Sequence, residues 1–138
     1  MPAIESPIFT PVKIGPVTLR NRVIRSAAFE NMAYGNKPSQ ELKDYHVAVA
    51  RGGVGMTTLA YASVSRGGLS FDGQLWIREE IVPALKDITD AIHAEGAKAS
   101  IQLGHCGNMT HRSTCGCTPV GASSEWSSLS TGPSGMSA

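Results

Sequence analysis

The sequence predicts an α/β fold in which strands and helices alternate along a parallel sheet. Two apolar runs, at 54–61 and 98–103, each follow a segment with helical periodicity. The first run has no polar alternation, as expected for a strand that is covered on both faces. Strands separated by helices favour a parallel arrangement with right-handed crossovers.

The N-terminal part of the chain predicts a hairpin that leads into the first core strand. Apolar residues recur through 8–25, and Gly15 and Pro16 interrupt them with a turn signal. The first core strand is expected at about 23–27. A loop rich in turn-forming residues follows at 30–38.

The first helix is expected to begin after Ser39, because a serine hydroxyl is a favourable N-cap. Glu41 places a carboxylate in the first turn, where the helix dipole favours negative charge. Gly52 and Gly53 end this helix before the strand at 54–61. A Gly- and Ser-containing loop is expected at 63–75.

The second helix is expected over about 79–95, with a start near Glu80, because Pro83 is tolerated only in the first turn. Gly96 closes it, and the strand at 98–103 follows. One apolar stripe supports this helix, formed by Ile81, Leu85, Ile88, Ala91 and Ile92. No periodicity continues beyond the third strand, so 104–138 is predicted as one long loop.

The composition predicts one soluble domain over residues 1–138. The formal net charge of +1 argues against a nucleic-acid partner, which requires a strongly basic face. No apolar run approaches the roughly 18 residues of a membrane span. The first seven residues lack the features of a signal peptide, and three cysteines do not indicate a disulfide framework. We therefore expect a protein of the reducing cytoplasm.

The most informative polar cluster lies at the end of the strand at 98–103. Gln102 and His105 stand at its carboxyl end, and Gly104 and Gly107 allow the backbone to turn there. In parallel α/β sheets, the chemistry is placed at the carboxyl ends of the strands. A glutamine amide offers a donor and an acceptor to a planar heterocycle. This segment is therefore the best candidate for a cofactor contact.

Four stretches in register resemble the Old Yellow Enzyme family, the FMN-dependent ene-reductases and 2,4-dienoyl-CoA-reductase-like flavoproteins. They are 9–22, which ends in Leu-Arg-Asn-Arg, then 51–55, 93–107 and 119–124. The third stretch contains Gln-Leu-Gly-His-Cys-Gly, similar to the family's Gln-Leu-x-His-x-Gly. The resemblance covers nearly the whole chain. It implies the first three β/α units, with an N-terminal hairpin, of a (β/α)₈ TIM barrel.

The resemblance also implies a function. Members are FMN-dependent NAD(P)H oxidoreductases that reduce activated, α,β-unsaturated alkenes by hydride transfer from the flavin. FMN is thus the expected cofactor, NAD(P)H the reductant and a small molecule the substrate. The family's substrate-activating His-His or His-Asn pair would lie beyond Ala138, so no catalytic residue is assigned here. We expect no tight FMN binding and no turnover from these 138 residues alone.

By the same resemblance, the ends of the three strands contact the flavin. His105 matches the family's loop histidine and would bind cofactor or substrate, or hold its loop. The family usually has proline at position 27 and Thr or Cys near position 29, and commonly has arginine at position 108. Here these positions are Ala27, Phe29 and Asn108. The implied cofactor contacts are Ser26, Ala27, Ala28, Phe29, Ala60, Tyr61 and Gln102.

Other interpretations remain open. The open edges of a three-stranded sheet could pair with a complementing chain or a second copy, which would make a non-catalytic module. A zinc site is a weaker alternative, because Cys115 and Cys117 have a C-x-C spacing rather than C-x₂₋₄-C. No metal is therefore expected. His46 and His93 are interpreted as packing or surface residues on the helices.

Overall fold

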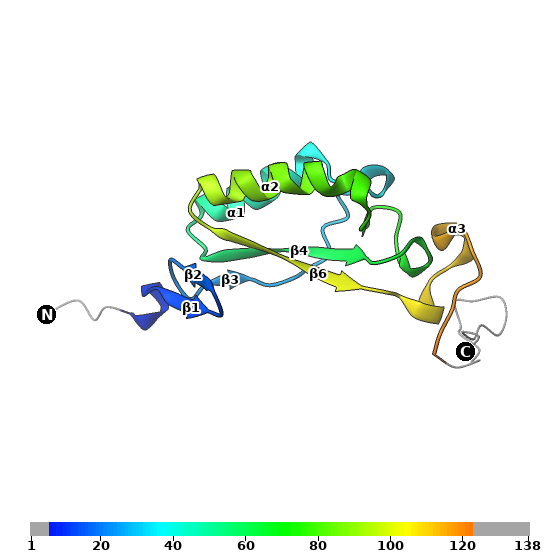
Figure 1. Ribbon diagram of the computed structural model, residues 1–138, viewed down its shortest axis with the longest axis horizontal. Helices are drawn as coiled ribbons and strands as arrows, with labels where there is room; N and C mark the ends of the chain where they lie inside the picture. Colours follow the sequence, from blue (N-terminus) through cyan, green and yellow to red (C-terminus); the bar gives the residue numbers. More distant parts are fainter. Residues whose placement is uncertain (1–5, 123–138) are drawn as a thin grey trace, which may run out of the picture.

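The computed structural model describes residues 6–122 and has two layers. Two helices lie side by side on one face of a parallel sheet, and a small antiparallel hairpin lies near the amino ends of the strands (Figure 1). A short third helix lies near their carboxyl ends. The strands are β1 (Val12–Ile14), β2 (Val17–Leu19), β3 (Ile24–Arg25), β4 (Met56–Ser63), β5 (Leu75–Trp76) and β6 (Lys98–Gly104). The helices are α1 (Gln40–Arg51), α2 (Val82–Ala94) and α3 (Arg112–Cys115).

Strand β4 is the centre of the sheet. It pairs in parallel with β3 on one side and with β6 on the other, which confirms the predicted α/β arrangement. The two-residue strand β5 also pairs with the end of β4 and begins at the last residue of the segment expected as a loop, 63–75. A strand of two residues carries no periodicity, so local sequence patterns cannot reveal it.

The first helix begins and ends as predicted. The hydroxyl of Ser39 accepts the N–H of Leu42 at 3.0 Å and donates to the carbonyl of Met32 at 2.5 Å. One serine therefore caps the helix and fastens the preceding loop to it. After the helix, Gly53 adopts a φ of 98°, a conformation that favours glycine.

The second helix starts slightly later than predicted. A 3-10 turn at Glu79–Ile81 precedes it, and Val82 is the first residue of the α-helix. Pro83 then lies at the start of the helix, where its missing N–H has no intrahelical partner to lose. Gly96, with a φ of 77°, turns the chain into β6 as expected.

The apolar core lies between the sheet and the two helices. The helices α1 and α2 pack there against Leu59 and Ala62 of β4. On the opposite face of the sheet, the hydroxyls of Thr58 and Ser100 are 2.7 Å apart. The buried core cluster is Ala33, Leu42, Ala50, Leu59, Ala62, Leu75, Ile88, Ile92 and Ala97.

The segment after β6, expected as a loop, contains a 3-10 turn at Gly107–Met109 and the single-turn helix α3. Residues 123–138 of that expected loop lie outside the described part of the chain. None of the helices within residues 6–122 is both long and apolar enough to cross a membrane.

Arg20 fastens the hairpin to the ends of both helices. Its guanidinium donates to the carbonyls of Ala50 at 2.5 Å, Val54 at 3.0 Å and Glu95 at 2.9 Å. Carbonyl groups at helix ends have no intrahelical partners, and a cation also suits the negative end of the dipole. One side chain thus joins the hairpin, the end of α1 and the end of α2.

We predict that Arg20→Ala lowers the free energy of unfolding by about 2 kcal/mol, the scale of lost hydrogen bonds to a charged group. Urea unfolding followed by far-UV circular dichroism measures this loss. Arg22→Ala is the matched control, because Arg22 is an exposed arginine close by in the sequence. Equal stability losses in the two variants would contradict the role assigned to Arg20.

Candidate functional site

The candidate site lies at the carboxyl ends of β3, β4 and β6. The segment 26–29 continues directly from β3, and Ala60 and Tyr61 lie in the second half of β4. Gln102 lies near the end of β6. The parallel pairing brings these three segments to the same edge of the sheet, as the sequence predicted.

An extra residue in β4 sets the geometry of this edge. Leu59 pairs with Ile101, and Ala62 pairs with Leu103, so β4 advances three residues while β6 advances two. Ala60 and Tyr61 therefore both lie opposite Gln102. This is a β-bulge, which is rare between parallel strands and redirects the side chains around it.

The amide of Gln102 is available to a ligand. Its side chain is exposed and makes no hydrogen bond to another residue within 6–122. A glutamine in this state has a donor and an acceptor to offer. The neighbouring Ser26, Ala27 and Ala28 are small, so they leave space for a flat group above the strand ends.

Three aromatic rings gather beside this edge. Phe29 stacks on Phe71, with ring centroids 4.8 Å apart, and its ring lies 5.6 Å from that of Tyr61 at a tilted angle. A Cβ added at Gly104 would lie 3.4 Å from Cδ2 of Tyr61, so the ring lies beside this glycine. Phe29 offers no hydrogen bond to a cofactor. Its position provides an apolar wall instead.

A cavity of about 370 Å³ opens next to the aromatic cluster, within the size range of small-molecule sites. Neither Asp, Glu, Lys nor Arg contributes to its described lining. The lining residues are Tyr61, Ser70, Phe71, Cys106, Met109 and His111.

His105 is exposed at the start of the loop after β6, and its ring is held by that loop. Its Nδ1 accepts the N–H of Gly107 at 3.0 Å. The ring lies against Gly68, where an added Cβ would be only 2.4 Å from Cδ2 of His105. Gly68 is therefore required for this packing. These contacts favour the loop-holding role over substrate binding.

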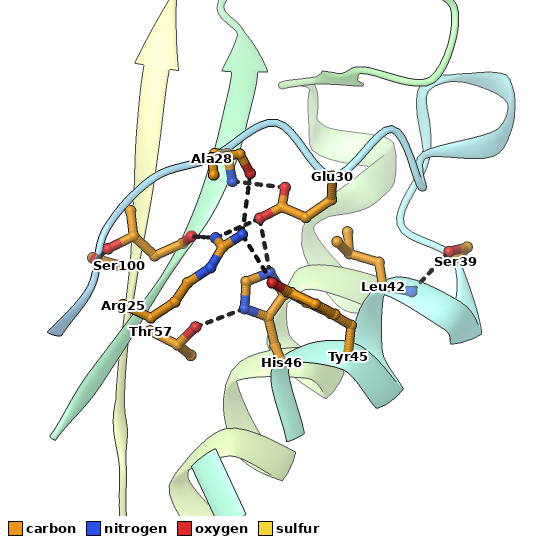
Figure 2. Close-up of polar contacts among 11 residues, drawn as sticks. Arg25, Ala28, Glu30, Ser39, Leu42, Tyr45, His46, Thr57 and Ser100 are labelled. Carbon is orange, nitrogen blue, oxygen red and sulfur yellow. Dashed lines mark hydrogen bonds and ion pairs between the residues drawn. The ribbon is translucent and has the colours of Figure 1, made fainter. Parts of the chain in front are cut away.

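Beneath the site lies a buried polar network that the sequence did not predict (Figure 2). The Glu30 side chain is 3% exposed, and its Oε1 accepts from Nη1 of Arg25 at 2.6 Å. His46 Nε2 lies 3.4 Å from the same oxygen, an ion-pair distance without hydrogen-bond geometry. The other carboxylate oxygen accepts the N–H of Ala60 at 3.0 Å. The other ring nitrogen of His46, Nδ1, lies 2.8 Å from the hydroxyl of Thr57.

This network keeps Glu30 ionised. Burial acts to raise the pKa of Glu30, but the contacts with His46, the Ala60 N–H and Arg25 outweigh it. The pKa is therefore held below its ordinary value of 4.5. His46, interpreted as a packing residue, is fully buried and belongs to the network, whereas His93 is exposed.

The zinc interpretation finds no support in the described part of the chain. There, no three side chains of His, Cys, Asp or Glu come together as a metal site. Cys115 is buried, and its thiol donates to the carbonyl of Cys117 at 3.2 Å. Burial and the neighbouring Cys115 raise the pKa of the Cys117 thiol, which disfavours the thiolate that binds metal.

The geometry fits a planar cofactor such as a flavin at the part of the site that this chain contains. The exposed amide of Gln102 can bind a heterocycle edge, and the small residues and aromatic rings can border its faces. A hairpin followed by three parallel β/α units, with polar groups at the carboxyl ends, defines the class: the first part of a (β/α)₈ barrel.

The comparison with known families identifies the particular family. Residues 7–129 match the family described as NADH:flavin oxidoreductase / NADH oxidase, and the chain belongs to it. The resemblance noted in the sequence is thereby confirmed.

Individual proteins agree with this assignment. The chain is 47% identical over 100 residues to a 4,4'-dithiodibutanoate disulfide reductase of Rhodococcus erythropolis, covering 72% of this chain and 25% of the relative. It is 38% identical over 108 residues to an NADPH dehydrogenase of Listeria welshimeri, covering 74% and 31%. The solved Old Yellow Enzyme homologue from Zymomonas mobilis superposes with a TM-score of 0.79 at 25% identity, covering 87% and 34%. The chain thus spans about a third or less of each of these proteins.

Two features of the site were missed from the sequence. Glu30 had a weak signal, because Arg25 and Glu30 are opposite charges on either side of the uncharged 26–29 segment. Phe71 had no signal in the sequence, because an isolated aromatic residue in a Gly- and Ser-containing loop does not indicate which ring it will stack on.

We predict that Glu30→Gln flattens the acid limb of the stability profile. Because the pKa of Glu30 is lower in the folded state, its ionised form stabilises the fold above pH 4.5. That contribution is lost as the pH falls below 4.5 through the folded-state pKa. Urea unfolding at stepped pH should show a shallower decline in the variant than in the wild type. Glu79→Gln, at an exposed glutamate, should keep the wild-type slope.

We predict that Phe29 and Phe71 are energetically coupled by about 1 kcal/mol, as for other stacked aromatic pairs. A double-mutant cycle with Phe29→Ala and Phe71→Ala, measured by urea unfolding, gives this coupling. Phe9 is 71% exposed, so Phe9→Ala combined with Phe29→Ala should be additive. Additivity between positions 29 and 71 would refute the stacking contribution.

Proposed function

We propose that this chain forms part of an FMN-dependent NAD(P)H oxidoreductase that reduces alkenes activated by a neighbouring carbonyl. The exposed amide of Gln102, which has no hydrogen-bond partner within residues 6–122 and lies at the carboxyl ends of three parallel strands, is the observation that carries the proposal. Family membership supports the flavin, and the relative from Listeria supports NADPH as a reductant.

Each part of the site has a role in this proposal. Gln102 binds the polar edge of the cofactor through its amide oxygen and nitrogen. Ala27, Ala28 and Ala60 are small and allow close approach of the ring system, while Phe29 and Tyr61 exclude water from its border. When bound, FMN supplies hydride transfer from the nicotinamide to the substrate alkene. The residues of this chain orient that chemistry and shield it from solvent.

An organic disulfide is a second candidate substrate class. The observation that favours it is the 47% identity to the Rhodococcus disulfide reductase. The reaction balances as one NAD(P)H, one proton and one disulfide giving NAD(P)⁺ and two thiols. Cys106 lines the cavity and would lie near such a substrate.

The test uses the whole protein, loaded with FMN and kept free of oxygen. We expect oxidation of NADPH or NADH that depends on an added enone such as 2-cyclohexenone. An organic disulfide in place of the enone tests the second candidate. The proposal would be overturned if neither the enone nor the disulfide supported oxidation of the nicotinamide. It would also be overturned if fluorescence titration showed no FMN binding.

We predict that Gln102→Leu weakens FMN binding about tenfold, the effect of losing roughly 1.4 kcal/mol of hydrogen bonding. Titration followed by flavin fluorescence gives the dissociation constants. Gln40→Leu is the matched control, since Gln40 is exposed on α1 and binds Asp44. An unchanged FMN affinity in the Gln102 variant would remove that residue from the site.

A further inference from the structure

One residue of the β4 bulge, Ala60, has an N–H that lies beyond the pairing of β4 with β3, which ends at Thr57. Between Leu59 and Ala62 the ladder to β6 is interrupted, and Ala60 is 5% exposed. A buried N–H group without an acceptor is costly, so the N–H of Ala60 needs an acceptor from elsewhere in the fold.

Glu30 provides that acceptor from the neighbouring strand segment. Its Oε2 accepts the N–H of Ala60 at 3.0 Å, and its other oxygen is held by Arg25 at 2.6 Å. Arg25 also donates to the carbonyl of Thr58 at 2.6 Å and to that of Ala28 at 3.1 Å. Figure 2 shows the carboxylate between Arg25 and the ring of His46. The ion pair of Arg25 and Glu30 therefore joins the end of β3 to two residues of β4, Thr58 and Ala60.

The bulge decides where Tyr61 lies. Without it, alternation from Leu59 would turn residue 61 toward the helices. With the extra residue, Ala62 returns to the core cluster instead, and the Tyr61 ring lies beside Phe29 and over Gly104. The direction of Tyr61 thus depends on a backbone irregularity that Glu30 holds in place.

We propose that Glu30, supported by Arg25 and His46, is a positioning residue that fixes the β4 bulge and so orients Ala60 and Tyr61 at the cofactor site. It acts through the Ala60 N–H and does not touch the cofactor. The identity of the ligand rests on the proposed function, but the coupling from Glu30 to the bulge and the aromatic cluster does not.

Two substitutions separate the contributions of Glu30. Glu30→Ala removes both acceptor oxygens. Glu30→Gln keeps one amide oxygen, which can serve either Arg25 or Ala60 but not both. We expect FMN affinity to fall roughly ten- to a hundredfold in Glu30→Ala, the range for lost partners of binding residues, and to fall less in Glu30→Gln. The near-UV circular dichroism of the aromatic cluster should decrease in the same order without FMN, while the far-UV spectrum is retained.

Ile92→Val is the matched control for a purely structural effect. Ile92 is fully buried on α2, so its variant is destabilised without touching the bulge. It should keep wild-type FMN affinity and near-UV signal. If it loses as much of either as Glu30→Gln does at similar stability, Glu30 has only a structural role. Wild-type affinity and near-UV signal in Glu30→Gln would also overturn the proposal, even if Glu30→Ala fails to fold.

The outcomes distinguish this proposal from the proposed function. These FMN titrations use the whole protein of which this chain forms part, and if its wild-type form does not bind FMN, the cofactor assignment fails. The near-UV comparison without FMN still decides whether Glu30 orients the bulge and Tyr61.

Discussion

One buried carboxylate connects the parts of the fold that form the site. Strand β3 has only two residues paired with β4, which is little to hold the segment that follows it. Glu30 extends this attachment, because it binds Arg25, faces His46 on α1 and accepts the N–H of Ala60 on β4. A buried charge is tolerated only when its partners are in place. A loop, a helix and a strand must therefore meet in one arrangement.

Stability and chemistry are separated within the same sheet. The face toward α1 and α2 carries the apolar core, and the helices contribute Leu42, Ile88 and Ile92 to it. The carboxyl ends carry an exposed amide at Gln102 and aromatic rings that are only partly covered. At the opposite end, Arg20 joins the hairpin to the ends of the helices. This division is typical of β/α barrels, in which loops at the carboxyl face vary while the scaffold is retained.

The elements that local patterns predicted are the ones whose causes are local. Ser39 caps α1 through a hydrogen bond to Leu42, three residues away, and the stripe through Ile88 and Ile92 forms one face of α2. Gln102 was correctly placed near the end of a strand, because the apolar run before it and the glycines after it are also local signals. Strand β5 and the stacking of Phe71 on Phe29 were not predicted, because their partners are distant in the sequence and leave no periodic signal.

The sequence by itself determined the order of hairpin, strands and helices, their approximate ends, and the family through four short motifs. These properties follow from capping, turn residues and the repeat of apolar side chains along each element. Only the tertiary structure decided that Ala60 and Tyr61 both lie opposite Gln102, and that Glu30 is buried beneath them. The register of β4 against β6 depends on pairing between separate segments, and an acidic residue reveals its burial only when the cation and the N–H that hold it are in place.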